Sequence, residues 1–331
     1  MSKNKKYTIG GLFSGVGGIE QGFINKGFDV LWSNDIDEPS SKTFKLNFHH
    51  KHILQDIHLL KGKNLEPVDV LVGGFPCQAF SIAGYRKGFQ DQRGNLFFEI
   101  ARLIDELKFK PKALLLENVK NFYSHDNGNT YKVVKKTLEE LGYSVFTSIL
   151  NTSVITRIPQ NRERTFIICF LEGKDALLDP KNKMSIKFNK VFPPNKINNP
   201  KHISNFLETK KVDDKFYYGK EKYMYEELLK SIKSKDTVYQ WRRHYVRENK
   251  KDVCPTLTAN MGTGGHNVPL IMDQWGFRKL TPRECFNLQG FPKSYKLPDD
   301  IANSHLYKQA GNSVTVTLIE ILAEQIKECL D

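Results

Sequence analysis

Two hydrophobic patterns alternate along the first half of the chain. Short runs are apolar at nearly every position, and between them lie longer stretches that are apolar every third or fourth residue. The runs predict strands at residues 7–13, 28–32, 68–72, 113–116, 143–150 and 164–170, and the periodic stretches predict helices at residues 19–25, 96–107, 133–141 and 316–330. Strands that are apolar throughout are buried on both faces. The pattern therefore predicts an α/β fold with a doubly wound, mostly parallel sheet.

The pattern changes after about Leu171. Lysine, asparagine and aspartate crowd the chain up to Lys201, and beyond it the alternation is lost apart from a charged helix predicted at residues 221–233. Polar and glycine-rich loops dominate the end of this region. We therefore expect a sheet domain at residues 1–177, a smaller irregular region at residues 178–277, and a return to the sheet domain at residues 278–331.

The composition suits a globular protein with a strong positive charge. Of the 331 residues 39% are hydrophobic, and 50 Lys and Arg against 37 Asp and Glu give a net charge of +13. Clustered cations bind nucleic acids by releasing counterions, so nucleic acid is the first candidate partner, although a generally lysine-rich composition would explain the same charge. No apolar run approaches the roughly 20 residues that cross a membrane. No secretory segment follows the charged N-terminus, so we expect a cytoplasmic protein.

A glycine-rich loop follows the first predicted strand and contains Gly15, Gly17 and Gly18. Glycines let a ligand approach the backbone closely. Asp35 lies just beyond the next strand, where a carboxylate can accept hydrogen bonds from ribose hydroxyls. Glu20 stands where a dinucleotide-binding fingerprint has its third glycine, so the loop fits a nucleotide-like ligand without matching that fingerprint. A tight strand-to-helix turn would also explain the glycines.

Cys77 and Glu117 follow two predicted strands, at the edge where open parallel sheets bind ligands. A thiol and a carboxyl group of raised pKa placed there can act as nucleophile and acid. From the residues alone, Cys77 could equally be a core thiol and Glu117 the ion-pair partner of an arginine. None of the five cysteines lies in a CxxC pair, so we expect no metal site. Their odd number, with no secretory segment, favours reduced thiols.

The segment from Tyr239 to Arg247 mixes aromatic residues with arginines, including Arg242 and Arg243, and Lys250 and Lys251 follow it. Arginines read base edges and lysines contact phosphates, so this composition suits DNA. A solvated protein face would have the same composition. The glycine-rich loop at residues 261–267 is a second candidate DNA contact, which could fit a groove or merely turn the chain.

Taken together and in order, these segments resemble the C5 cytosine-specific DNA methyltransferases of bacterial restriction–modification systems. The resemblance covers about residues 8–170 and 278–325. It rests on the glycine loop with Phe13, Gly74-Phe75-Pro76-Cys77-Gln78, Glu117-Asn118-Val119, Gln160-Asn161-Arg162-Glu163-Arg164, Arg283-Glu284 with Gln289-Gly290-Phe291-Pro292, and Gly311-Asn312-Ser313-Val314. It implies the fold of S-adenosylmethionine-dependent methyltransferases and DNA (cytosine-5-)-methyltransferase activity on a short, specific double-stranded sequence.

In such an enzyme the Cys77 thiolate would add to C6 of cytosine, which makes C5 nucleophilic toward a methyl group. The resemblance implies that Glu117 hydrogen-bonds at N3, and that Arg162 and Arg164 hold the cytosine carbonyl oxygen and favour the thiolate. The target must leave the duplex to reach a cysteine in a cleft, so base flipping is expected.

The resemblance also implies S-adenosylmethionine as cofactor. Phe13 would pack against it, Asp35 would bind its ribose, Ile36 would cover the adenine and Asp56 would accept from the adenine amino group. The rest of the pocket would be formed by Gly15, Gly17, Gly18, Pro76, Leu96, Asn312 and Val314.

Residues 178–277 would form the target-recognition domain. Pro255-Thr256-Leu257 resembles a short Thr-Leu element of the family, so Thr256 is expected near a phosphate or base. Arg242 and Arg243 are expected to read bases, and Lys250 and Lys251 to contact phosphates. We further expect a monomer that acts on double-stranded DNA and is paired functionally with a restriction endonuclease.

Three other functions remain open from the sequence. A tRNA-methylating member of the same family is the nearest, but the sizeable variable region before Arg278 favours duplex DNA. A nicotinamide oxidoreductase is disfavoured by the incomplete glycine fingerprint and by the pair Cys77 and Glu117. A non-catalytic DNA-binding regulator would have no need of Cys77, Glu117, Arg162 and Arg164 together.

Overall fold

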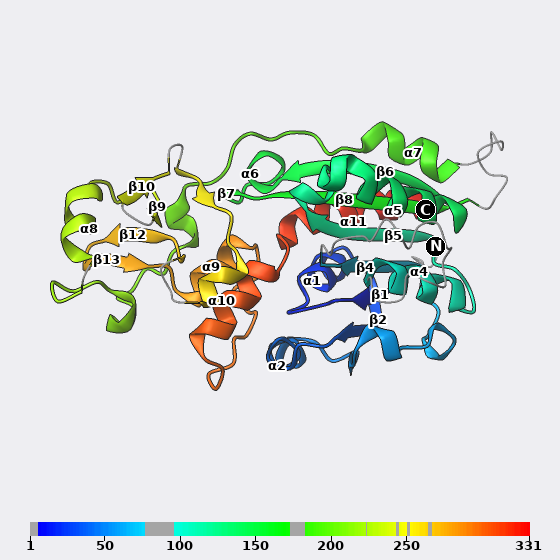
Figure 1. Cartoon of the computed structure of the whole chain (residues 1–331), viewed down its shortest axis with the longest axis horizontal. Coiled ribbons are helices and arrows are strands. Elements are labelled where there is room, and N and C mark those ends of the chain that lie inside the picture. The colour runs from blue at the N-terminus through cyan, green and yellow to red at the C-terminus, as the bar shows by residue number, and fades with distance from the viewer. Residues whose placement is uncertain are drawn as a thin grey trace, which may run out of the picture.

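A computed structural model describes residues 6–76, 96–172, 183–222, 224–242, 245–249, 252–263 and 267–331. A large part is built on a seven-stranded sheet and a smaller part on a four-stranded sheet (Figure 1). Helices α9 (Pro282–Leu288) and α10 (Asn303–Asn312) lie between the two sheets in this view.

The large sheet has the strand order β3-β2-β1-β4-β5-β8-β6. Its strands are β1 (Thr8–Leu12), β2 (Asp29–Asp35), β3 (Lys51–Leu54), β4 (Val70–Gly74), β5 (Ala113–Val119), β6 (Tyr143–Asn151) and β8 (Glu163–Leu171). The first five strands in this order are mutually parallel, whereas β8 runs antiparallel to both β5 and β6. The predicted α/β class with a mostly parallel sheet is confirmed.

All the helices predicted for this part are present, with shifts of a few residues at their ends. They are α1 (Gly18–Asn25), α4 (Leu96–Glu106), α5 (Asn129–Glu140) and α11 (Val316–Leu330). Helix α2 (Glu38–Asn47) was not predicted, because three of its four buried residues, Ser40, Ser41 and Thr43, carry hydroxyl groups. The apolar spacing that marks a buried helix face is therefore absent from its sequence. Short helices α6 (Thr152–Ile155) and α7 (Lys183–Val191) also belong to this part, although α7 lies beyond the boundary predicted after residue 177.

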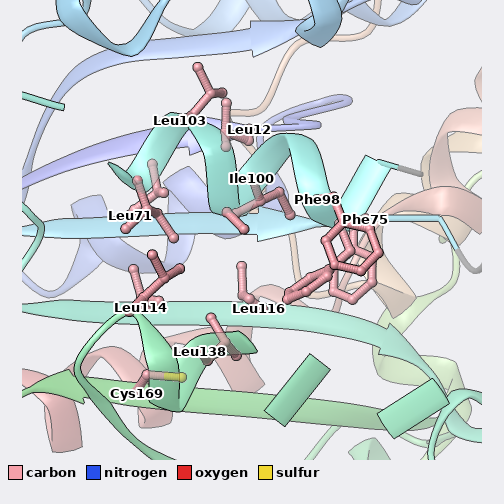
Figure 2. Packing of buried hydrophobic residues seen from close by; sticks show 14 of the residues in the cluster. Leu12, Leu71, Phe75, Phe98, Ile100, Leu103, Leu114, Leu116, Leu138 and Cys169 are labelled. Atoms are coloured by element: carbon pink, nitrogen blue, oxygen red, sulfur yellow. The ribbon is translucent and has the colours of Figure 1, made fainter. Parts of the chain in front are cut away.

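The strands at the centre of the sheet send alternate side chains to two separate hydrophobic cores. On β5, Leu114 and Leu116 enter one core, whereas Ala113 and Leu115 enter the other. Figure 2 shows the first core, in which Ile100 and Leu103 of α4 face the strands. Helices α1, α7 and α11 supply the second core on the opposite face, where α1 and α7 each pack against α11. Burial on both faces explains why these strands are apolar at every position.

The smaller part is more regular than the sequence predicted. An antiparallel sheet of order β10-β9-β12-β13 replaces the expected loops. Its strands, β9 (Tyr239–Arg242), β10 (Tyr245–Glu248), β12 (Leu270–Asp273) and β13 (Gly276–Lys279), have four residues each, too few for a clear alternation. Helix α8 (Tyr225–Ser231) is shorter than expected, and the predicted boundary between residues 277 and 278 falls inside β13.

A third core joins the two parts. It combines Phe44 and Phe48 from α2 and its end with Leu257, Met261 and Phe286, among others. Next to it, β7 (Gln160–Asn161) pairs in parallel with β11 (Cys254–Pro255). In the described part of the chain, no helix combines the length and the apolarity needed to cross a membrane. The same residues contain no cluster of three or more His, Cys, Asp or Glu side chains suited to hold a metal ion.

Candidate active site

A cavity of about 500 Å³ opens at the carboxyl ends of the parallel strands. The described residues around it come from the glycine loop and the start of α1, the ends of β2, β4 and β5, the start of α2, the segment that enters β8, the end of α10 and the segment that joins α10 to α11. They are Phe13, Ser14, Gly15, Val16, Gly18, Ile19, Asp35, Asp37, Ser40, Gly74, Phe75, Pro76, Glu117, Asn118, Val119, Arg162, Arg164, Gln309, Gly311, Asn312, Ser313 and Val314. Segments from both ends of the sequence thus meet at one site.

The glycine loop adopts a conformation that requires glycine. Gly15 and Gly17 have φ values of 53° and 78°, in the left-handed region, and Gly17 precedes the first turn of α1. A Cβ on Gly15 would meet no atom within 4 Å, so this residue faces open space. A Cβ on Gly17 would instead lie 2.3 Å from the Phe48 ring. Gly15 therefore borders the cavity, whereas Gly17 holds the loop against α2.

Phe13, at the start of this loop, is strained. Its φ of 54° is rare for a bulky residue, and such a conformation costs about 1–3 kcal/mol. The side chain lines the cavity. Strained residues held in place by their surroundings cluster at ligand sites, so the position of Phe13 is consistent with a binding role.

Asp35 organises the loop as well as facing the cavity. One carboxylate oxygen accepts the Gly15 N–H at 2.6 Å, and the other accepts the Asp37 N–H at 2.7 Å. Burial raises the pKa of Asp35 above its ordinary value, while these backbone hydrogen bonds oppose the rise. The predicted ribose ligand is therefore also the residue that fixes the glycine loop next to β2.

Glu117 and Arg164 form an ion pair in the wall of the cavity. Arg164 Nε lies 3.0 Å from Glu117 Oε1, and both side chains are nearly buried. Glu117 pairs with Gly74 across the parallel strands β4 and β5, which places it beside the segment that leads to Cys77. Burial raises the pKa of Glu117, and the positive charge of Arg164 opposes this rise. A carboxyl group that can hold a proton thus lies at the predicted position.

Asn118 connects Glu117 to the segment before Cys77. Its side-chain N–H donates to the Phe75 carbonyl oxygen at 3.0 Å. Pro76 lines the cavity and is exposed. Cys77 itself lies outside the described residues.

Arg162 is engaged differently from Arg164. Its Nη1 donates to the Leu257 carbonyl at 2.8 Å, and its Nη2 donates to the Gly311 and Ser313 carbonyls. Burial lowers the pKa of Arg162 to about 9, so the guanidinium is still charged at neutral pH. Only its Nε has no partner in the described structure. Arg162 therefore holds backbone segments together at the cavity wall.

Four of the predicted cofactor residues do not line the cavity. Gly17, described above, is one of them. Ile36 is another and is 65% exposed, and a third, Leu96, starts α4 and packs at the edge of the first core. Asp56 accepts from the backbone N–H of His58 at 3.0 Å and from its ring at 2.6 Å. Phe13, Gly15, Gly18, Asp35, Pro76, Asn312 and Val314 do line it.

Several lining residues were missed in the sequence. Ser14 and Val16 lie within the glycine loop, and Asp37 and Ser40 follow Asp35 closely, so their spacing could have revealed them. Gln309 lies one helical turn before Asn312 on α10, so the predicted motif at residues 311–314 could have pointed to it.

Two of the predicted DNA contacts can be placed. Arg242 is exposed at the end of β9, where its guanidinium donates to the Gln240 side chain at 3.1 Å. Thr256 is half-buried, and its hydroxyl donates to the Asn161 carbonyl. Arg243, Lys250 and Lys251 lie outside the described residues.

Comparisons with known proteins agree with this arrangement. The family model of C-5 cytosine-specific DNA methylases matches residues 7–328. The type II methyltransferase M.Bsp6I of Bacillus sp. (strain RFL6) is 49% identical over 96% of this chain and 98% of its own length. The type II methyltransferase M.HhaI of Haemophilus parahaemolyticus is 36% identical over 97% of this chain and 94% of its own length.

The fold is also found in solved structures of low sequence identity. The Schizosaccharomyces pombe (S. pombe) Dnmt2 methyltransferase superimposes with a TM-score of 0.73 at 18% identity, covering 99% of this chain and 100% of its own. The glycine loop, the Glu117–Arg164 pair and the match over nearly the whole length lead to one assignment. The chain belongs to the C-5 cytosine-specific DNA methylase family.

Proposed function

We propose that this protein transfers a methyl group from S-adenosylmethionine to C5 of cytosine in a short, specific sequence of double-stranded DNA. The observation that carries the proposal is that one cavity brings together the glycine loop, Asp35 and the buried Glu117–Arg164 pair. The residues suited to a cofactor and the carboxyl group of Glu117 thus line the same cavity. Transfer of a methyl group between two bound molecules requires such proximity.

The residues of the cavity fit a nucleoside cofactor. Asp35 is an acceptor suited to ribose hydroxyls, and the open space beside Gly15 lets a ligand reach the backbone. The Ser14 hydroxyl is buried at the cavity without a partner in the described structure. Phe13, Asn312 and Val314 supply further contacts. S-adenosylmethionine, bound there, supplies an electrophilic methyl group.

The protein's own groups prepare the cytosine. The Cys77 thiolate would add to C6 and the ring electrons would move to C5, which would then attack the methyl carbon. The bond from that carbon to the sulfonium sulfur would break, and S-adenosylhomocysteine would be the leaving group. Glu117 shares a proton with N3 and so limits the negative charge on the ring, and Arg164 holds Glu117 and the carbonyl oxygen. Loss of the C5 proton then expels the Cys77 thiolate and restores the aromatic ring. Arg162 supports this site through the backbone it binds.

The smaller part would supply sequence recognition. On β9, Tyr239 points into a small core while Arg242 is exposed, which leaves a polar face for DNA. We place the end of this target-recognition domain after Lys279, because a boundary within β13 would break its sheet. The relatives are named type II methyltransferases, which supports a role in protecting host DNA beside a restriction endonuclease. Action as a monomer in the cytoplasm is part of the same proposal.

The test is methylation sequencing of DNA from cells that express this chain. We expect 5-methylcytosine at one position of a single short sequence. A parallel assay with purified protein and labelled S-adenosylmethionine compares duplex DNA with tRNA. Methylation of tRNA but not of DNA would assign the protein to the alternative substrate, and methylation of neither would refute the proposal.

A further inference from the structure

The link between the two parts of the molecule is a buried polar network. The paired strands β7 and β11 place the segment around Leu257 against the segment that leads to Arg162. Cys254 N–H donates to the Pro159 carbonyl at 2.7 Å, and the Thr256 hydroxyl donates to the Asn161 carbonyl. The Thr-Leu element of the recognition side is thereby fixed to the catalytic side.

Side chains from the catalytic side bind both backbone polar groups of Leu257. Its N–H donates to Gln160 Oε1 at 3.1 Å, and its carbonyl accepts from Arg162 Nη1 at 2.8 Å. Leu257, Gln160 and Arg162 are all buried. A buried peptide group that loses its partner destabilises the fold, so Leu257 has few alternative positions.

The same network reaches the wall of the cavity. Gln160 Nε2 lies 3.2 Å from Gln289 Oε1, and Gln289 Nε2 donates to the Ala310 carbonyl at 2.6 Å. Thr315 donates its hydroxyl to Gln289 Oε1 at 3.2 Å. A continuous path of hydrogen bonds therefore runs from Leu257 through two fully buried glutamines to the segment that carries Asn312 and Val314.

The backbones at the two ends of this path also touch directly. A Cβ on Gly311 would lie 2.1 Å from the carbonyl carbon of Thr258. Arg162 Nη2 donates to the carbonyls of Gly311 and Ser313 while its Nη1 holds Leu257. If the Thr-Leu element shifts, the segment around Gly311 in the cavity wall must therefore shift with it.

We infer that Gln160 and Gln289 are positioning residues that couple DNA binding at the Thr-Leu element to cofactor binding at the 311–314 segment. The inference rests on the proposed function, because it takes the cavity as the cofactor site and Thr256 as near DNA. Neither glutamine lines the cavity, so each acts through the backbone that it holds. Coupling between two sites is reciprocal, so each ligand must tighten the other by the same factor.

The test measures that factor in the full-length protein. Calorimetry gives the dissociation constant of S-adenosylhomocysteine, a stable cofactor analogue, with and without a duplex that carries the site found by methylation sequencing. In the wild type we expect DNA to tighten the analogue at least about fivefold, the lower end of typical coupling. In Gln289→Met, which keeps the side-chain length and loses the hydrogen bonds, the ratio should fall to about one.

A control and a milder variant separate coupling from general loss of stability. Asn249 has a buried amide that donates to the Val238 carbonyl within the smaller part, so Asn249→Leu should lose stability and keep the wild-type ratio. If Gln289→Met does not fold, Thr315→Val removes one bond to the network with little change in shape. Hydrogen exchange of the peptide around Leu257 gives a second readout, since the analogue should slow it in the wild type but not in the variants.

The outcomes are distinct. A wild type that binds neither ligand would refute the proposed function. A wild type that binds both ligands independently, or network variants that keep the wild-type ratio and exchange pattern, would overturn the coupling while leaving the proposed function intact.

Discussion

Arg164 Nε and Glu117 Oε1 lie 3.0 Å apart in the wall of the cavity, and this contact opposes the rise that burial causes in the pKa of the carboxyl group. The residues pair through neighbouring antiparallel strands, with Arg164 opposite Val119 and Glu117 opposite Phe166. Burial raises the pKa of Glu117 and the Arg164 charge opposes the rise. The charge of Arg162 also opposes the rise, so the protonation of this carboxyl group depends on burial and on two neighbouring arginines.

Replacing Arg164 should change both the rate and its pH dependence. Without the guanidinium charge, the pKa of Glu117 rises further, so the protonated form persists to higher pH. In Arg164→Met we expect kcat to fall about 100-fold, as for loss of one stabilising donor, and the alkaline limb of the pH–rate profile to move to higher pH. Arg164→Lys retains the charge and should keep the limb in place. An unshifted limb in Arg164→Met would show that Glu117 does not govern this limb.

Cys77→Ser should abolish methyl transfer while duplex DNA still binds. The weaker nucleophile cannot form the adduct at C6, whereas the surfaces that contact DNA are unchanged. DNA with 5-fluorocytosine at the target should trap the wild type covalently, because fluorine cannot leave as the C5 proton does. Gel electrophoresis under denaturing conditions detects the adduct. Full activity of the serine variant would exclude the proposed nucleophile.

Asp35→Ala should weaken S-adenosylhomocysteine binding more than DNA binding. The change removes acceptors for the ribose and also frees the N–H groups of Gly15 and Asp37. Loss of hydrogen bonds to a charged group costs about 1.5–3 kcal/mol. Asp35→Asn, which retains one carbonyl acceptor, should lose less affinity. Calorimetry that finds the same cofactor affinity in Asp35→Ala would remove this residue from the site.

Glu20→Gln should flatten the dependence of stability on pH. The Glu20 carboxylate is buried next to Gly11 and Ser14 and forms no ion pair in the described structure. Burial raises the pKa of Glu20 from 4.5 to about 7, and Asp35 contributes to the rise. The folded state therefore keeps the proton more tightly than the unfolded state, and stability is lost as pH rises from about 4.5 through 7. The shift corresponds to about 3 kcal/mol.

Urea unfolding at pH 5 and pH 8 measures this effect. The difference in unfolding free energy between the two pH values should be larger in the wild type than in Glu20→Gln. The exposed Glu140 provides the control, since Glu140→Gln should behave as the wild type does. If the unfolding free energy depended on pH equally in all three proteins, the pKa of Glu20 would not be raised in the folded state.

Exchange of the recognition region should move methylation to another sequence. A chimera should replace residues 201–279 with the corresponding segment of a relative that reads a different site, because this range keeps β13 whole. It should retain residues 254–258 of this protein, because the buried hydrogen-bond network holds them in place. Among single changes, loss of the exposed Arg242 should cost about 1–3 kcal/mol and relax one base position if it reads a base. If Lys250 contacts a phosphate, its loss should weaken binding to all DNA sequences alike. It should also lower by about 1 the slope of the logarithm of the binding constant against the logarithm of the salt concentration. An active chimera that still methylates the original sequence would place recognition elsewhere.

Much of this protein is determined by short stretches of its sequence. Strands that are apolar at every position must be buried on both faces, so the α/β class followed from the alternation of such strands, including those around Leu114 and Ile168, with helical stretches. The positions of Gly15 and Glu117 at the site also followed from the local sequence, because a strand places the residues at its carboxyl end at the ligand-binding edge of the sheet. Local spacing was sufficient for these elements since their positions depend on neighbours in the chain.

Contacts between distant residues were decided by the tertiary structure. Arg162 donates to carbonyls 95, 149 and 151 positions away, and backbone carbonyls exist at every residue, so no sequence pattern marks them as its partners. Helix α2 was hidden because hydroxyl side chains fill its buried face, and the strands of the smaller sheet are too short to show a period. The sequence by itself determined the fold class and the chemical groups; folding decided which backbone segments those groups hold, because hydrogen-bond partners are chosen by proximity in space.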